Sequence, residues 1–434
     1  MRSDRAIDRL LILALLLGAR CIGAESLKET IGLALAHDAS IASAAQEAQA
    51  SRLDAGSAKY AVLPSLSLGG SYQYDSGTAD LTLPLGPGGR PQTLNLSQQN
   101  TIDMNAGFKW LPFTGFAQEA TIEQKRLQAL LADNSLDSAR NDVALGAITA
   151  FRQAQAAELQ IETLGSASRR AQLQIDQTQA LERQGMAMKV DVLSLTIARL
   201  DYDQKLIAAK AALADALEQL KYLTGKDIAV PSPPEEEPGL SPPSLDEAGT
   251  SQIKALFIQR GILETSRTLA RSKLYPTLAL SGALHYGLPG VNPVQNEWML
   301  YGVAGATVTW SYDWGGDALA AQAVDHSIAR LASDEKTARE RIELGYDSAL
   351  RDWSAAREAL DVAKASLDLA KTKMRIVDSQ YGQGMASTTD FNDANLGLTQ
   401  AELQYRTQLL SLLLKASQIE ALSGESLEKW SVAQ

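Results

Sequence analysis

The chain has 434 residues, of which 45% are hydrophobic and 6% aromatic, and its formal net charge is −11. A surface that binds nucleic acid needs an excess of Lys and Arg to neutralise phosphates, so this charge excludes nucleic acid as an expected partner. The length and the hydrophobic content are those of a folded protein with a sizeable core.

The first 24 residues have the pattern of a secretory signal peptide. Three arginines precede an apolar run at 10–17, and small residues follow up to Ala24. The apolar run is too short to cross a membrane, and we expect cleavage after Ala24. Cys21, the only cysteine, leaves lipidation open as an alternative, although the charged Arg20 stands where a lipoprotein signal has a small residue.

Two β-hairpins are expected. In the first, apolar and polar side chains alternate over 65–75 and again over 102–110, separated by the Gly/Pro-rich stretch 78–100, which we expect to be a long loop. The second hairpin, 276–315, has a shorter loop. One apolar face, one polar face and aromatic residues near the strand ends suit a membrane barrel. The same alternation also suits a soluble sandwich, and no later apolar stretch is long enough for a membrane helix.

Long helices follow each hairpin. Residues 115–184 are rich in Ala, Gln, Leu, Glu and Arg, and after Gly115 they contain no proline, which predicts a coiled-coil rod of roughly 105 Å. The return helix, about 189–223, carries two adjacent heptad seams, Leu193/Leu200/Ile207 and Leu206/Leu213/Leu220. Two seams indicate neighbours on both sides, as in a ring of helices.

The two halves of the chain repeat each other. Three pairs keep one constant separation: Gly185/Gly384, Asp191/Asp390 and Gly225/Gly424. This indicates an internal duplication. The expected segments are a signal peptide (1–24), a first-repeat helix (25–63), a β-hairpin (64–114), a long helical hairpin (115–225), a Pro-rich linker (226–250), a second-repeat helix (251–275), a β-hairpin (276–315), a long helical hairpin (316–424) and a tail (425–434).

Four strands cannot close a barrel, and an open sheet edge is not tolerated in lipid. Closure would need oligomerisation. Two chains give eight strands, a barrel filled by its own side chains, whereas three chains give 12 strands and can leave a water-filled lumen. A pore joined to a ring of helices about 100 Å long would be a conduit.

The sequence resembles the TolC family of outer-membrane efflux and secretion channels over essentially all of the mature chain. The most specific stretch is 185–193 with 220–225, and its second copy is 381–393 with Ser423-Gly424. The resemblance implies a mainly α-helical homotrimer with a 12-stranded transmembrane β-barrel and a periplasmic α-helical barrel. It also implies the outer membrane of a Gram-negative bacterium, a periplasmic adaptor (membrane fusion) protein, and an inner-membrane pump of the RND, ABC or MFS type.

By this resemblance, four residues at the hairpin tips dock the adaptor: Gly185, Met186, Gly384 and Met385. Glycine permits the left-handed turn that reverses the chain, and methionine offers a soft apolar contact. The alternative is a helix-hairpin turn without a partner.

The resemblance also implies roles for residues beside the tips. Asp390 and Asp393 match a ring of carboxylates at the periplasmic entrance that would favour cations; the alternative is solvated surface acids. Asp191 and Tyr381 match residues that join neighbouring hairpins in the closed state.

The sequence departs from the family at two positions of this closed-state set. Ala386 and Leu409 stand where the family has arginines. We therefore expect a leakier or differently latched entrance.

The sequence disfavours two other classes of protein. An enzyme is not expected, because the three histidines His37, His285 and His326 are scattered and no catalytic, cofactor-binding or metal-binding constellation appears. His285 is expected to be a lumen-facing strand residue. A non-channel periplasmic coiled-coil scaffold would explain the helices but not the four alternating strands. The sequence does not specify the cargo or the class of pump.

Overall fold

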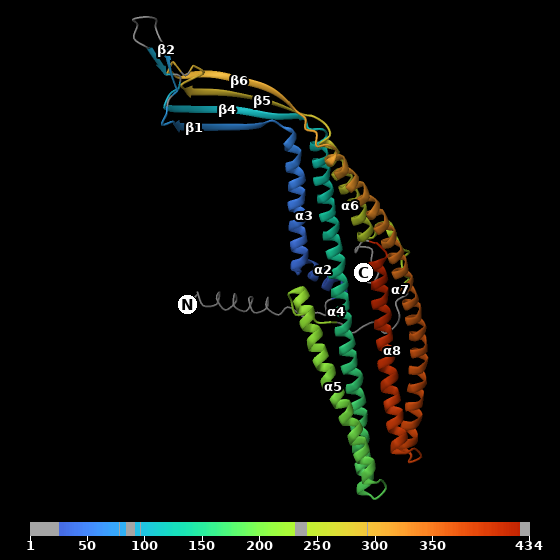
Figure 1. Ribbon diagram of the computed structural model, residues 1–434. Coiled ribbons are helices and arrows are strands. Elements are labelled where there is room, and N and C mark those ends of the chain that lie inside the picture. Colours follow the sequence, from blue (N-terminus) through green and yellow to red (C-terminus); the bar gives the residue numbers. More distant parts are fainter. Residues whose placement is uncertain are drawn as a thin grey trace, which may run out of the picture. The chain divides into compact units, whose positions relative to one another are not determined.

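A computed structural model describes residues 26–77, 79–83, 92–95, 97–230, 241–292 and 294–425 (Figure 1). The expected signal peptide, the Pro-rich centre of the linker and the tail beyond Glu425 lie outside the described residues. The chain forms two compact units. The hairpin unit contains the described residues of Met1–Ala45, Asn134–Lys254 and Lys336–Gln434, and the sheet unit contains those of Gln46–Asp133 and Ala255–Glu335.

The sheet unit is built on four antiparallel strands in the order β1-β4-β5-β6 (Figure 1). Their bounds are Ser65–Tyr74 (β1), Asn100–Phe113 (β4), Thr277–Leu288 (β5) and Met299–Thr309 (β6). The expected alternation is confirmed. Leu66 pairs with Phe108 on one face, and Asn105 pairs with His285 on the other. The sheet therefore has one apolar and one polar face, and its apolar leucines are exposed in the single chain.

Both outer edges of this sheet are open. Among the described residues, β1 and β6 each pair with one neighbour only, β4 and β5 respectively. An open edge presents a row of unpaired backbone N–H and C=O groups. The edges therefore require partners that one copy of the chain does not supply.

Aromatic residues lie at both ends of the strands. At one end Trp110 Nε1 donates to the Val62 carbonyl at 2.9 Å, and Trp310 Nε1 makes the equivalent bond to Leu274 at 3.3 Å. At the other end the Tyr286 and Trp298 rings stack 4.8 Å apart. Amphipathic aromatic rings at both ends of an apolar band are typical of strands that meet two membrane–water interfaces.

The expected long loop at 78–100 is only partly correct. Two short strands, β2 (Asp80–Leu83) and β3 (Gln92–Asn95), form a separate antiparallel pair within it. Both contain the alternation of Leu and Thr that suits a strand. The neighbouring prolines and glycines obscured this short pattern.

The first expected helix is also divided in two. Helix α2 (Leu27–His37) ends at Asp38, whose backbone is extended, and α3 (Ala39–Ala58) begins directly after it. The Asp38 carboxylate accepts a hydrogen bond from the Ser40 N–H at 2.7 Å, as an N-cap does. Expecting one continuous helix was wrong because this cap lies within an otherwise uniform Ala-rich pattern.

Two helices of equal length begin in the sheet unit and end in the hairpin unit. They are α4 (Ala117–Arg183) and α7 (Gly316–Gly382), each of 67 residues. Helix α6 (Ser251–Ser272) belongs mainly to the sheet unit, where Arg267 and Arg271 each pair with Asp325 at 3.4 Å. No helix among the described residues is both long and apolar enough to cross a membrane.

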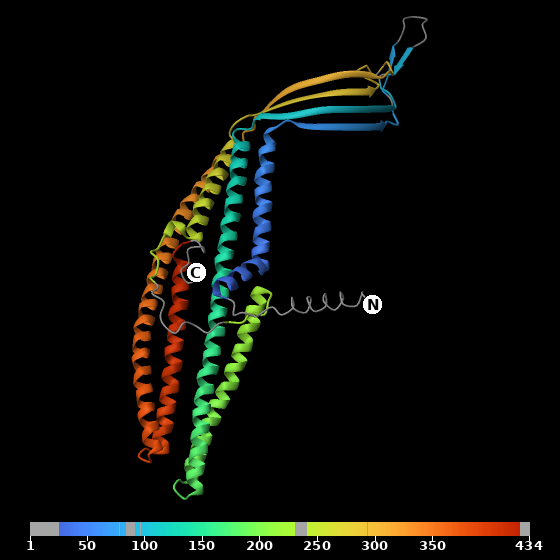
Figure 2. The same ribbon diagram turned by 180° about the vertical axis from the view of Figure 1, so that it is seen from behind.

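The hairpin unit contains two helical hairpins. Hairpin 1 joins α4 to α5 (Lys189–Thr224), and hairpin 2 joins α7 to α8 (Thr388–Leu422). Figures 1 and 2 both show the order α5, α4, α8, α7 across this unit. A core cluster that includes Leu195, Leu360 and Leu409 joins the two hairpins. Alanines buried along α4 allow the helices to approach closely.

The two heptad seams of α5 differ in burial. Leu220 of one seam is fully buried within the unit. Leu193, Leu200 and Ile207 of the other seam are exposed, with Leu200 at 54%. One side of α5 therefore packs within the chain, and the other side lacks a partner in a single copy.

Candidate functional site: the hairpin tips and the groove between the hairpins

Both hairpin tips are closed by the same turn. Gly185 and Gly384 have φ values of +75° and +71°. The Met186 N–H donates to the Leu181 carbonyl at 2.9 Å, and the Gly185 N–H donates to Glu182 at 2.9 Å. The equivalent bonds of the second tip measure 2.9 and 3.0 Å. This is a Schellman motif, in which a glycine in the left-handed region ends the helix.

The residue that follows each tip glycine is an exposed methionine. Met186 is 64% exposed and Met385 is 68% exposed. Met188 and Val190 extend the apolar surface of the first tip. Apolar side chains at the end of a polar rod gain free energy only when another surface covers them. The sequence placed all four predicted docking residues at the tips, and this is where they lie.

Asp191 and Asp390 occupy equivalent positions at the start of α5 and α8. The Asp390 carboxylate accepts hydrogen bonds from the Ser387 hydroxyl at 2.6 Å and the Ser387 N–H at 2.9 Å, which lower the pKa of Asp390. Asp191 accepts from the Met188 N–H at 3.1 Å. Both aspartates therefore cap their own helices. Asp390 and Asp393 are both exposed on the first turns of α8.

Tyr381 joins the two hairpins. Its hydroxyl lies 3.0 Å from the Thr178 hydroxyl of hairpin 1 and 3.2 Å from the Thr388 hydroxyl of its own hairpin. Its ring packs against Phe391 at 5.6 Å. Thr178 is fully buried, so this bond is shielded from water. Tyr381 therefore bonds across the hairpins of one chain, whereas the hydrogen bond of Asp191 to Met188 lies within its own hairpin.

Arg170 of α4 makes a second link between the hairpins, which the sequence reasoning missed. Its Nε donates to Asn395 Oδ1 at 2.7 Å, and its Nη2 donates to the Thr399 hydroxyl at 3.3 Å. Glu402 lies 3.9 Å away. Asn395 and Thr399 are buried on α8. In the sequence, this arginine is marked only by its position beside the small residue Ala171. The structure shows that Ala171 belongs to the buried side of α4.

The missing family arginines have a local explanation at one position. Leu409 is fully buried in the core cluster that joins the hairpins. An arginine there would bury its charge in an apolar environment, which is costly without a paired acid. The cross-hairpin arginine of this chain is instead on α4, and its acceptors are on α8.

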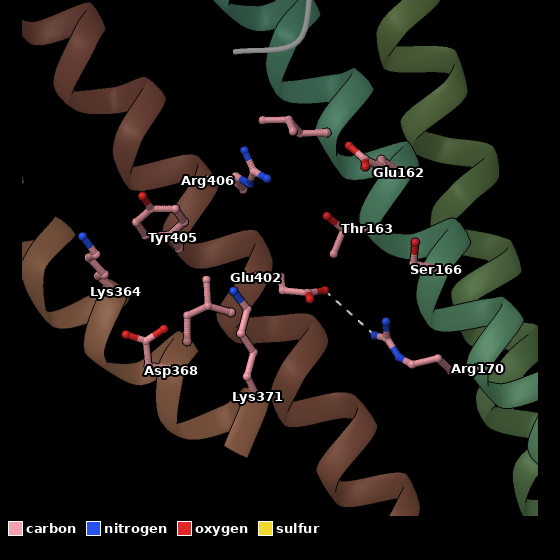
Figure 3. Close-up of a pocket in the computed structure, with 12 residues that line it drawn as sticks. Glu162, Thr163, Ser166, Arg170, Lys364, Asp368, Lys371, Glu402, Tyr405 and Arg406 are labelled. Carbon is pink, nitrogen blue, oxygen red and sulfur yellow. Dashed lines mark ion pairs between the residues drawn. The ribbon is translucent and has the colours of Figure 1, made fainter. Parts of the chain in front are cut away.

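A charged groove of about 400 Å³ lies between α4, α7 and α8 (Figure 3). Its lining includes four basic residues and three acidic residues: Arg170, Lys364, Lys371, Arg406, Glu162, Asp368 and Glu402. Figure 3 shows the Arg170–Glu402 ion pair at its edge. The groove contains no histidine or cysteine. No group of three metal-ligating side chains occurs among the described residues.

Residues 30–226 match the family model described as outer membrane efflux protein. A comparison with curated protein sequences finds no match.

Solved structures of outer-membrane proteins share the fold. VceC from Vibrio cholerae has a TM-score of 0.75 at 14% identity, covering 92% of this chain and 96% of that chain. The Campylobacter jejuni channel CmeC has a TM-score of 0.76 at 15% identity, covering 95% and 88%. The Neisseria gonorrhoeae channel MtrE has a TM-score of 0.70 at 16% identity, covering 92% and 89%.

These findings define the chain as one with the fold of outer-membrane efflux channels. It carries an outer membrane efflux protein domain, and the resemblance to the TolC family is confirmed.

Proposed function

We propose that the protein is a trimeric outer-membrane channel, the exit duct of a tripartite efflux pump or of a type I secretion system. The observation that carries this function is an open four-stranded sheet with an exposed apolar face, joined in one chain to paired helical hairpins. Three copies complete a 12-stranded barrel in the outer membrane of a Gram-negative bacterium, with the apolar face toward lipid and the polar face toward the lumen. The helical hairpins form the periplasmic part of the conduit.

Two exposed apolar stripes on the hairpin unit support closure into a ring. One stripe is Leu193/Leu200/Ile207 on α5, and the other is Ile376/Leu369/Val362 on α7. These helices lie at opposite ends of the order shown in Figures 1 and 2. A different surface on each side gives a head-to-tail contact, which generates a closed ring when the rotation closes.

Corresponding residues of the two stripes lie at the same distance along their helices from the hairpin tips. Leu193, Leu200 and Ile207 lie eight, fifteen and twenty-two positions after Gly185. Ile376, Leu369 and Val362 lie eight, fifteen and twenty-two positions before Gly384. At about 1.5 Å per residue, each pair lies at the same distance from its tip. Neighbouring copies therefore pack α5 against α7 with these leucines, isoleucines and valine in register.

The hairpin tips dock a periplasmic adaptor protein, which couples the channel to an inner-membrane pump of the RND, ABC or MFS type. The exposed Met186 and Met385 beside equivalent glycine turns support this role. Photocrosslinking in cells from a probe at Met385 tests it. Capture of a periplasmic adaptor is expected, and a probe that labels no periplasmic protein while the chain is trimeric in the outer membrane would contradict the assignment.

Asp390 and Asp393 supply six carboxylates at the periplasmic entrance of a trimer, a fixed negative charge that favours cations. The links made by Tyr381 and Arg170 hold hairpin 2 against hairpin 1 and keep this entrance narrow. The channel opens when these bonds break. The buried acceptors Thr178, Asn395 and Thr399 support this role, because their bonds exist only while the hairpins are together.

Recording current across planar lipid bilayers tests the channel itself. The protein extracted from outer membranes should produce discrete current steps. A protein that leaves the membrane fraction without detergent and produces no current would instead support the periplasmic scaffold, which the four-stranded sheet disfavours. The family is one of channels rather than enzymes, and no catalytic role is assigned to any residue.

A further inference from the structure

The polar face of the sheet carries an acid–histidine pair where β4, β5 and β6 meet. His285 Nδ1 lies 3.0 and 3.1 Å from the two carboxylate oxygens of Asp103. Asn105 Nδ2 donates to the same carboxylate at 2.9 Å, and the Tyr301 ring stacks on the imidazole at 5.1 Å with 8° between the planes. The His285 and Asp103 side chains are half-buried.

The strand register produces this contact. His285 is directly opposite Asn105 on β4 and Tyr301 on β6, whereas Asp103 is opposite Gly287. Because Gly287 has no side chain, the Asp103 carboxylate can lean diagonally to His285. Such diagonal neighbours on one face are within reach of long side chains. A β-carbon at position 287 would lie 3.4 Å from Asp103 Oδ1 and 3.2 Å from the Ile102 carbonyl.

The other charged groups on this face lie further along the strands. From β4 the charged groups are Asp103 itself and Lys109, which is four positions from Asn105, the residue opposite His285, and so roughly 13 Å away. From β6 the facing titratable group is Tyr301, and phenols stay neutral near pH 7. From β1, Ser71 is opposite Asp103, and the charged group is Asp75, four positions after Ser71 and bonded to Gln73. No other charged side chain of the described chain contacts His285.

Imidazole is the side chain that gains or loses its proton between pH 5 and 8, and aspartate carboxylates are ionised throughout that range. The chain has 3 histidines. His37 lies beside Gly225 in the hairpin unit, and His326 lies on α7. The Asp103–His285 pair is therefore neutral when the imidazole is protonated and carries one negative charge when it is not.

We propose that the Asp103–His285 pair makes the ion selectivity of the pore depend on pH. The proposal rests on the proposed channel function, in which the polar face lines the lumen. Three copies of the pair contribute three negative charges to the lumen when the imidazoles are neutral and none when they are protonated. The cation preference rises with pH. Three unit charges at roughly 10 Å from the permeating ion, screened over one Debye length, favour K⁺ and disfavour Cl⁻ by similar amounts, which changes the permeability ratio of K⁺ to Cl⁻ roughly fivefold.

Reversal potentials across planar bilayers under a KCl gradient, at pH 5 and pH 8, test the proposal. The wild-type ratio of K⁺ to Cl⁻ permeability should rise roughly fivefold between pH 5 and pH 8. H285Q should keep the high ratio at both values of pH. D103N should still respond to pH, but with a lower ratio than wild type at each value.

H326Q is the matched control, since it removes a histidine outside the sheet, and its ratio should rise as in wild type. H285Q with the same rise as wild type, or a wild-type ratio that does not change with pH, would overturn the inference. Either result would leave the channel function intact. Wild-type protein that produces no current would refute the channel function and this inference with it.

Discussion

Removing the Arg170 side-chain charge should shift the channel toward its open state. The variant R170M keeps most of the side-chain volume but loses the guanidinium that joins α4 to α8. It deletes the 2.7 Å hydrogen bond to Asn395 and the 3.3 Å hydrogen bond to Thr399. The side-chain amide oxygen of Asn395 then stays buried without the donor that Arg170 supplied. Met186 and Met385 at the tips are untouched.

The expected magnitude follows from these contacts. A hydrogen bond from a charged donor contributes about 1.5–3 kcal/mol, and an unpaired buried acceptor costs about 1–3 kcal/mol. The 3.3 Å hydrogen bond to Thr399 is long, and the 3.9 Å ion pair with Glu402 is partly exposed and screened by solvent. Each therefore adds little to the stability of the joined hairpins. The joined state of the hairpins should therefore lose about 2–3 kcal/mol. This corresponds to a change of roughly 30- to 150-fold in the ratio of closed to open channels.

Single-channel recording measures this ratio as the open probability. R169M is the matched control, because the neighbouring Arg169 is exposed and, within the described part of the chain, its side chain bonds to Ser166 of its own helix and not to hairpin 2. R169M should behave as wild type. If R170M and R169M have the same open probability as wild type, the link between Arg170 and α8 does not hold the entrance closed.

Three further variants probe the tips and the second link. G384A forces a β-carbon into the left-handed region and should destabilise the tip by about 1–2 kcal/mol, seen as faster proteolysis there, whereas G146A in the middle of α4 should be neutral or stabilising. Y381F should raise the open probability less than R170M, since it removes one neutral hydrogen bond worth about 1 kcal/mol across the hairpins. The pKa of Asp390 is lowered by Ser387, so its ionised form stabilises the first turn of α8 above about pH 4, and this contribution is lost as the pH falls. Amide exchange in that turn should accordingly be faster in D390A than in wild type at pH 7, and the difference should shrink below about pH 4. Equal proteolysis of G384A and G146A, an unchanged Y381F channel, or a D390A difference that persists at low pH would contradict the respective argument.

Sequence patterns that extend over many residues predicted the architecture. The constant separation of Gly185 and Gly384 revealed the duplication, and strict alternation revealed all four strands of the main sheet, because a pattern that spans many residues outweighs local ambiguity. Short structural features were not predicted from the sequence. The cap at Asp38 and the β2/β3 pair each depend on a few residues inside a stretch of different composition.

The candidate site was predictable where one segment defines it and not where two segments meet. The tips are single turns, so their glycines and methionines could be read directly. Arg170 acts through Asn395 and Thr399, more than two hundred positions away, and no periodicity in the sequence relates them. The departure at Leu409 led to the expectation of a leakier or differently latched entrance, which stays a prediction, and the bonds from Arg170 on α4 to α8 come from packing that the sequence does not reveal.

Disulfide cross-linking between copies tests the trimeric channel most directly. The variant carries L200C and L369C, at equal distance from their tips, and the expected cleavage after Ala24 removes the native Cys21. Oxidation in intact cells should produce covalent dimers and trimers and no larger species. The control pair L200C and L344C places one cysteine at a different height and should not cross-link. Monomers alone, or a ladder that continues beyond three copies, would contradict a closed ring of three chains.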